Sequence, residues 1–150
     1  MSRRAKRKVD HVRHALQTGQ SNEQGLDEVR FVHNALSGIA LHDVSLKTTI
    51  GDLELRSPIF INAMTGGAKK VTRINGALAE VAKATGLAMA VGSQMAAVKD
   101  PTLRHSYQIV REVNPHGVIL ANIGSEATVD EGQRAVNMIQ ADALQVHLNV

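Results

Sequence analysis

Four short clusters of small and hydrogen-bonding residues stand out in this sequence of 150 residues. They are Ala63-Met64-Thr65-Gly66-Gly67, Gly92-Ser93-Gln94-Met95, Asn122-Ile123-Gly124-Ser125 and His147-Leu148-Asn149. Small residues let a planar ring approach the backbone, and hydroxyl and amide side chains offer neutral hydrogen bonds to the rim of that ring. Any one cluster alone favours an ordinary turn, because glycine, serine and asparagine are common turn residues. Four clusters at equivalent positions predict a shared ligand site.

The elements that must position these clusters are strands and helices in alternation. Apolar runs predict strands at 58–64, 87–91, 117–122 and 143–150, and helical spacing fills the intervals between them. This alternation is typical of a parallel sheet covered on both faces, in which function gathers at the carboxyl ends of the strands. The sequence therefore predicts the α/β class, either as the first four βα units of a (β/α)8 TIM barrel or as a small doubly wound domain.

The chain is expected to be one domain with three parts. Residues 1–40 form a basic arm with a short helix, residues 41–56 form a hairpin around Gly51-Asp52, and residues 57–150 form the half barrel. The chain ends inside its fourth predicted strand, with no helix after it to cover that strand. We therefore expect an amino-terminal piece of a longer barrel protein.

Composition and charge exclude several classes of protein. The sequence has no Cys, which excludes disulfides, Fe–S clusters and a thiol nucleophile. No apolar run approaches the roughly 20 residues of a membrane span, and the amino terminus has no apolar leader, so a cytoplasmic protein is expected. Residues 1–13 hold six basic residues against one acidic residue, whereas the rest has 11 basic and 13 acidic residues. This basic arm is either simply solvated or binds a phosphorylated ligand or nucleic acid.

Familiar catalytic motifs are absent. The sequence contains neither the GxGxxG pattern of dinucleotide sites nor the GxxxxGK[ST] pattern of P-loops. His11 and His14 have a spacing that could ligate a metal, although a solvated or capping role is favoured for them. His147 lies at the end of the fourth strand, where it is as well suited to line a site by hydrogen bonding as to catalyse.

At these residues the sequence resembles the type 2 isopentenyl-diphosphate isomerases, the flavin-dependent enzymes of isoprenoid biosynthesis. The resemblance runs in order over essentially the whole chain. Its main segments are Arg7-Lys8-Val9-Asp10-His11, Gly25-Leu26-Asp27, Phe31-Val32-His33, the run from Ile59 to Gly67, Val91-Gly92-Ser93-Gln94-Met95, Ala121-Asn122-Ile123-Gly124 and Gln145-Val146-His147-Leu148-Asn149. The pairing of Ala-Met-Thr-Gly-Gly with Gly-Ser-Gln-Met at this spacing is far more specific than a lone glycine pattern.

The resemblance implies a TIM barrel with FMN at its mouth, and it implies a role for each matching residue. The flavin would be contacted by Ala63, Met64, Thr65, Ser93 and Asn122. The substrate diphosphate would be bound by Arg7 and Lys8, and the substrate pocket would be completed by Ser93, Gln94 and Met95. The same site would be lined by His147 and Asn149. The reaction implied is the interconversion of isopentenyl and dimethylallyl diphosphate by a 1,3-allylic proton transfer. Reduced FMN would be the acid–base group, NADPH would reduce it, and Mg²⁺ would shield the diphosphate.

One departure from the family's pattern limits what this chain can do by itself. The metal-binding Glu of the family would lie beyond Val150, as would the loops that hold the flavin phosphate. No catalytic side chain and no metal ligand are therefore expected within the chain, and the chain alone is expected to be inactive. A diphosphate substrate and a homo-oligomer are expected, without nucleic acid or membrane partners. Two alternatives stay open: another FMN-dependent TIM-barrel oxidoreductase, or a small α/β binding module with a basic tail for nucleic acid.

Overall fold

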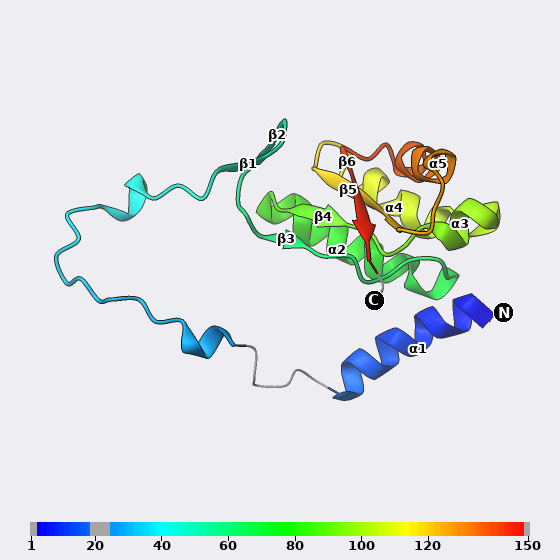
Figure 1. The fold of residues 1–150 in the computed structure, drawn as a ribbon, viewed down its shortest axis with the longest axis horizontal. Coiled ribbons are helices and arrows are strands. Elements are labelled where there is room, and N and C mark those ends of the chain that lie inside the picture. Colours follow the sequence, from blue (N-terminus) through cyan, green and yellow to red (C-terminus); the bar gives the residue numbers. More distant parts are fainter. Residues whose placement is uncertain (1–2, 19–24, 149–150) are drawn as a thin grey trace.

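The computed structural model describes residues 3–18 and 25–148 of the chain (Figure 1). Its main sheet has four strands: β3 (Phe60–Ile61), β4 (Ala88–Ala90), β5 (Ile119–Gly124) and β6 (Ala143–His147). Each strand pairs in parallel with the next one along the chain, so the spatial order is β3-β4-β5-β6. The carboxyl ends of all four strands therefore meet at one edge of the sheet.

The helices that connect these strands begin and end at residues suited to those positions. They are α2 (Thr72–Thr85), the short α3 (Met95–Lys99), α4 (His105–Val113) and α5 (Val129–Ile139), with the 3₁₀ turns η3 (Lys69–Val71) and η4 (Pro101–Leu103). Helix α2 stops at Gly86, which has a left-handed φ of 70°. Asp100 caps η4, and Thr128 caps α5 in a reciprocal pair of hydrogen bonds with Glu131. These are local signals that the sequence carries.

The helices cover one face of the sheet. Crossovers between parallel strands are almost always right-handed, and with strands in sequential order this places each helix on the same side. The core between helices and sheet contains Met89, Val91, Ile119, Ala121 and Ile123 from the strands and their loops, and Ala79, Ala82, Tyr107, Val110, Ala135 and Ile139 from the helices. Since side chains alternate along a strand, Ala90, Asn122, Gln145 and His147 point to the opposite face. That face carries no helix in the described part of the chain.

The predicted TIM barrel is wrong for the part of the chain that the structure describes. The sheet there is open, with β3 and β6 each paired on one side only, and only one of its faces is covered by helices. Closure of a barrel of this kind takes eight strands, which four βα units cannot supply. The observed fold is a small α/β protein with a four-stranded parallel sheet and a separate two-stranded antiparallel sheet.

The antiparallel sheet is the hairpin of β1 (Thr48–Ile50) and β2 (Leu53–Leu55), which turns at Gly51 with a φ of 57°. Before it lie α1 (Arg3–Thr18) and two 3₁₀ turns, η1 (Leu26–Glu28) and η2 (Leu41–Asp43). Residues 27–47 are exposed and make a wide excursion away from the main sheet (Figure 1). Within the described ranges, no helix combines the length and the apolar character needed to cross a membrane.

Candidate functional site

A row of four polar side chains crosses the carboxyl end of the sheet on the face without helices. Gln145 Nε2 lies 3.3 Å from Asn62 Oδ1, and Asn122 Nδ2 donates to Gln145 Oε1 over 2.9 Å. The other side of the Asn122 amide, Oδ1, is 2.9 Å from Nδ1 of His147. Asn62 follows β3 and Gln145 lies on β6, the two outermost strands, so the sheet must curve strongly for these side chains to meet. The curvature makes the helix-free face of the sheet concave.

The hydrogen-bond row fixes how His147 presents its ring. Because Nδ2 of Asn122 donates to Gln145, Oδ1 is the atom that faces His147, and an oxygen can only accept. Nδ1 of His147 is therefore the donor in this contact, and the hydrogen bond orients the imidazole ring. Asn122 is 3 % exposed, whereas His147 is half-buried, so the imidazole lies at the boundary between the row and solvent.

The loop after β4 places its three predicted residues in different surroundings. Ser93 is half-buried, Met95 is buried in the core, and Gln94 is fully buried. The Gln94 amide donates to the carbonyl of Ala135 over 2.9 Å and accepts from the backbone N–H of Asn122 over 2.9 Å. Gln94 thus ties β5 to helix α5, and of the three residues Ser93 is the one that the structure leaves partly accessible.

The loop after β3 also places its predicted residues in different surroundings. Ala63 is half-buried and Met64 is largely exposed, so both are accessible at the concave end. Thr65 is buried, and its hydroxyl donates to the side-chain oxygen of Asn75 on α2. This loop therefore offers a site its backbone and an apolar Met side chain, while the Thr65 hydroxyl is engaged inside the protein.

The basic arm reaches this region through helix α1. Arg7 and Lys8 lie within α1, whose Val12 packs against Ala68, Val71 and Ile74 just beyond the loop after β3. Helix α1 is thereby placed beside the segment that connects this loop to α2. Asn149, the last predicted site residue, lies outside the described residues.

Two acidic side chains near the carboxyl end, Asp100 and Glu131, are held by helix N-termini, whereas a third, Glu126, lies exposed in the loop after β5. Asp100 accepts from the backbone N–H of Thr102 over 3.0 Å and from its hydroxyl over 2.7 Å, and these bonds lower the pKa of Asp100. The backbone N–H of Thr128 donates to Glu131 and lowers the pKa of that carboxyl. Among the described residues, no group of three or more His, Cys, Asp or Glu is placed to hold a metal ion. The row itself is built from three amides and an imidazole.

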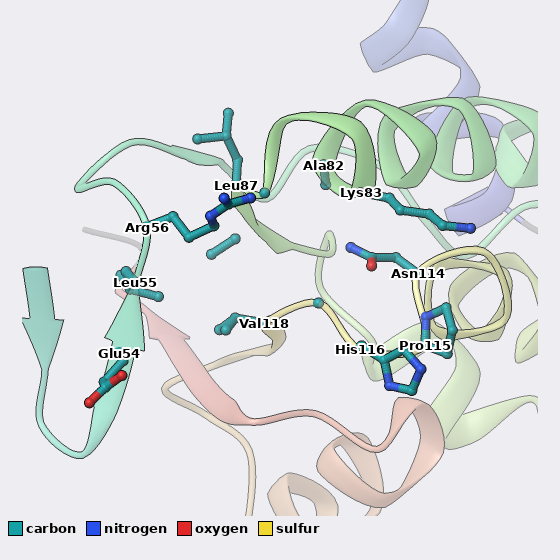
Figure 2. Close-up of a pocket in the computed structure, with 13 residues that line it drawn as sticks. Glu54, Leu55, Arg56, Ala82, Lys83, Leu87, Asn114, Pro115, His116 and Val118 are labelled. Carbon is teal, nitrogen blue, oxygen red and sulfur yellow. The ribbon is translucent and has the colours of Figure 1, made fainter. Parts of the chain in front are cut away.

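A cavity of about 420 Å³ lies at the opposite, amino end of the sheet (Figure 2). Arg56, Lys83 and His116 line it, together with the carboxyl-terminal residues of α2 and the loop that follows α4. Helix C-termini carry partial negative charge, which cations offset. Lys83 lies in the last turn of α2, and the side chain of Arg56 lies directly against Gly86, where that helix ends. The positive charge here is accounted for by the helix ends, and we assign no ligand to this cavity.

Four residues of the carboxyl end were not among the residues predicted from the sequence to form the site: Asn62, Gln145, Asn75 and Tyr107. For Asn62 and Gln145 a signal was available, because each is a lone amide within an otherwise apolar strand. Asn75 and Tyr107 lie on helices and read from the sequence as ordinary members of an amphipathic pattern. Their contacts with the loops required the structure.

The fold and this end together define a class: an α/β protein whose parallel strands carry, at their carboxyl ends, a hydrogen-bonded row of amides and an imidazole. No protein-family model matches the sequence. The chain is similar to curated proteins named isopentenyl-diphosphate delta-isomerase, with 58% identity to that of Bacillus licheniformis, 56% to that of Bacillus cereus and 55% to that of a Geobacillus species. Each alignment spans 148 residues, which are 98% of this chain and 42% of the relative.

These comparisons correct the narrower identification made from the sequence. The relatives are named isopentenyl-diphosphate delta-isomerase with no type attached, and their similarity extends over nearly all of this chain but over less than half of their own length. The identification as an amino-terminal fragment of a type 2 enzyme is therefore withdrawn. The similarity stands at the level of isopentenyl-diphosphate delta-isomerase.

Proposed function

We propose that this protein serves the interconversion of isopentenyl and dimethylallyl diphosphate in isoprenoid biosynthesis. The observation that carries the proposal is the identity of 55–58% over 148 residues to proteins with this activity in their name. The isomerisation adds a proton to one end of an allylic system and removes a proton from the other, so atoms and electrons balance without an oxidant. An unactivated alkene is a very weak base, and the site must therefore hold it in place and keep water out.

Within this proposal, the carboxyl end of the sheet binds and orients the reacting groups. The row of Asn62, Gln145, Asn122 and His147 supplies hydrogen-bond donors and acceptors across the helix-free face of the sheet. Such a set suits the edge of an uncharged heteroaromatic ring, and it lacks the fixed charge that a phosphate group needs. Beside the row, the half-buried Ala63 and the exposed Met64 offer a ring a small residue and an apolar side chain.

We further propose FMN as the ring that this set holds, contacted by Ala63, Met64, Thr65, Ser93 and Asn122. Ser93 is half-buried and Asn122 already bridges two strands, so both present polar atoms at fixed positions. When bound in its reduced form, FMN would supply the acid–base chemistry, with NADPH as its reductant. Ser93, with His147 and Asn149, completes the proposed substrate side of the site, whereas the side chains of Gln94 and Met95, predicted to contact substrate, are buried in the protein and support the loop instead.

The diphosphate of the substrate is proposed to bind Arg7 and Lys8 of α1. An Arg guanidinium can bind a phosphate with two parallel hydrogen bonds, and Lys adds a compact positive charge. The contact of Val12 with Val71 places α1 beside the loop after β3, which supports this assignment. The described residues offer no set of ligands that fits a metal ion, so Mg²⁺ enters the proposal only as a companion of the diphosphate, and no step depends on it.

The direct experiment is to express the chain that the gene encodes in full and to follow isopentenyl diphosphate by NMR. We expect dimethylallyl diphosphate to accumulate when FMN, NADPH and Mg²⁺ are present. Turnover that persisted after removal of all flavin would retain the isomerase proposal and refute the FMN part. No turnover under any condition, with the protein folded and flavin bound, would refute the isomerase proposal itself.

The arm can be tested with a matched pair of substitutions in the same helix. We expect Arg7→Ala to raise the KM for isopentenyl diphosphate about tenfold, the size typical of one lost charge-assisted hydrogen bond, while flavin affinity stays unchanged. Lys6→Ala removes an exposed positive charge one residue away and should leave KM unchanged. Equal effects of the two substitutions would show a general charge effect and would contradict a specific contact.

Three further expectations remain predictions: the division of the chain into arm, hairpin and sheet domain, the cytoplasmic location and a homo-oligomeric state.

A further inference from the structure

One turn of helix α4 supports both loops that flank the proposed site. Tyr107 of this turn is completely buried, and its hydroxyl donates to the backbone carbonyl of Ser93 over 2.6 Å. Burial raises the pKa of the phenol, so it remains a neutral donor throughout the physiological range. The carbonyl of a residue proposed to contact ligand is thus fixed by a side chain that lies behind the site.

The ring of Tyr107 also supports the loop after β3. A Cβ atom on Gly66 would overlap the ring at Cε1, and a Cβ atom on Gly67 would lie 2.9 Å from the Tyr107 hydroxyl. Both glycines have positive φ values, 148° and 76°, in the region that favours glycine. The loop can lie this close to the ring only because it has no side chains at these two positions.

A second buried contact joins the two loops to helix α2. Asn75 is 1 % exposed, and its Nδ2 donates to the carbonyl of Ser106 over 2.7 Å while its Oδ1 accepts from the Thr65 hydroxyl. The carbonyl of Thr65 in turn accepts from the N–H of Gly92 over 2.8 Å. The loop after β3 is therefore hydrogen-bonded to α2 on one side and to the loop after β4 on the other.

Ser106 completes the arrangement. Its hydroxyl accepts from the N–H of Gly67 over 3.0 Å and donates to the carbonyl of Leu103 over 2.6 Å. The hydroxyl is thereby oriented by the turn η4, which directly precedes its helix. Two adjacent residues of one helix thus form hydrogen bonds with two different loops: Ser106 with the loop after β3, and Tyr107 with the loop after β4.

We propose that Asn75, Ser106 and Tyr107 are positioning residues that hold the loops after β3 and β4 in fixed relation and thereby set the affinity of the site for its ligand. We call these three residues the clamp. The inference rests on the proposed function, because the affinity in question is that for FMN and isopentenyl diphosphate. No clamp residue touches the concave surface; each acts through Thr65, Gly67 or Ser93.

The test uses Tyr107→Phe and Ser106→Ala in the full chain that the gene encodes, with Val110→Ala as the matched control. Tyr107→Phe keeps the ring under Gly66 and Gly67 and removes only the hydrogen bond to Ser93. Val110 is equally buried on the same helix, one turn further from the loops. Amide hydrogen exchange at Gly67, Gly92 and Ser93, flavin affinity, KM, kcat and melting temperature are measured for each variant.

We expect faster exchange of loop amides in both clamp variants and a three- to tenfold loss of flavin affinity, the range typical of one hydrogen bond. Val110→Ala should lower the melting temperature more than Tyr107→Phe does. At temperatures well below melting, however, it should leave the amide exchange of the loops and the flavin affinity unchanged. Affinity losses that simply follow the melting temperature across all three variants would overturn the clamp.

The clamp would also be overturned if the loop amides of Tyr107→Phe and Ser106→Ala exchanged as slowly as those of the unsubstituted protein, whether or not flavin binds. Failure of the proposed function is a separate result, because it is seen in the unsubstituted protein as a lack of flavin binding and turnover.

Discussion

The two ends of the parallel sheet are built from different kinds of group. At the amino end, cations dominate: Arg56 lies against the end of α2, Lys83 is in its last turn, and Arg111 pairs with Asp142. At the carboxyl end, helix N-termini engage the carboxylates of Asp100 and Glu131, and the helix-free face shows amides and an imidazole. Charge offsets the helix dipole at the last turns of α2 and α4 and at the first turn of α5, whereas the row at the carboxyl end is made of amides and an imidazole and is left to bind a ligand.

The largest effect on stability is expected from Arg111→Ala at the amino end. The Arg111 side chain is 16% exposed and donates to the carbonyls of Gly117, Ile139 and Gln140 and to Asp142. Its removal leaves several carbonyls and one carboxylate without their donor, and we expect a loss of about 3 kcal/mol in the free energy of unfolding. Urea denaturation measures this loss, and flavin affinity of the remaining folded protein should not change.

Arg134→Ala is the control for that substitution. Arg134 is half-exposed and pairs with Asp130 four residues earlier on α5, so its loss should cost only about 0.5 kcal/mol. A loss of flavin affinity in Arg111→Ala would break the separation of the two ends, because it would couple the amino end to ligand binding.

Asn122→Ala at the carboxyl end should lower flavin affinity strongly and the free energy of unfolding only slightly. The substitution removes the donor to Gln145 and the acceptor for His147, both of which are half-buried and can turn to water. We expect a loss of stability of about 1 kcal/mol and a loss of flavin affinity of at least tenfold. Calorimetry and flavin fluorescence on the same samples give both quantities. Flavin affinity equal to that of the unsubstituted protein would show that the row does not form the site.

The smallest effect concerns pH and the cap of α5. Hydrogen bonds from Thr128 lower the pKa of Glu131 below its ordinary value of 4.5. A lowered pKa in the folded state means that Glu131 stabilises the protein fully above pH 4.5 and loses this contribution as pH falls through the folded-state pKa. Glu131→Gln should therefore narrow the difference in stability between pH 6 and about pH 3, measured by urea denaturation. An unchanged pH profile would show that the cap does not depend on the charged carboxyl.

Local signals in the sequence were enough to predict most elements. The spacing of apolar residues located α2, α4 and α5, and Gly86 and Asp100 marked a helix end and a helix start because their conformations and hydrogen bonds depend only on near neighbours. Strand β3 proved much shorter than its apolar run, with two residues in the ladder. Its remaining length forms the loop that the clamp holds.

Long-range contacts explain what the sequence could not predict. Asn62 and Gln145 meet across 83 positions of chain, and only the curvature of the assembled sheet brings them together. Gln94 has the residue type of a binding side chain, yet its amide is engaged between β5 and α5. The barrel prediction failed for a related reason, because the number of strands that close a sheet is a property of the whole chain.

The strictly sequential order of the sheet has a consequence for synthesis. Phe60 pairs with Ala88, Met89 with Ile119, and Leu120 with Ala143, so each strand meets a partner that has already left the ribosome. No strand has to wait for a distant segment or be inserted between two others. Nascent chains can therefore assemble unit by unit during translation, with a single growing edge that each new βα unit covers in turn.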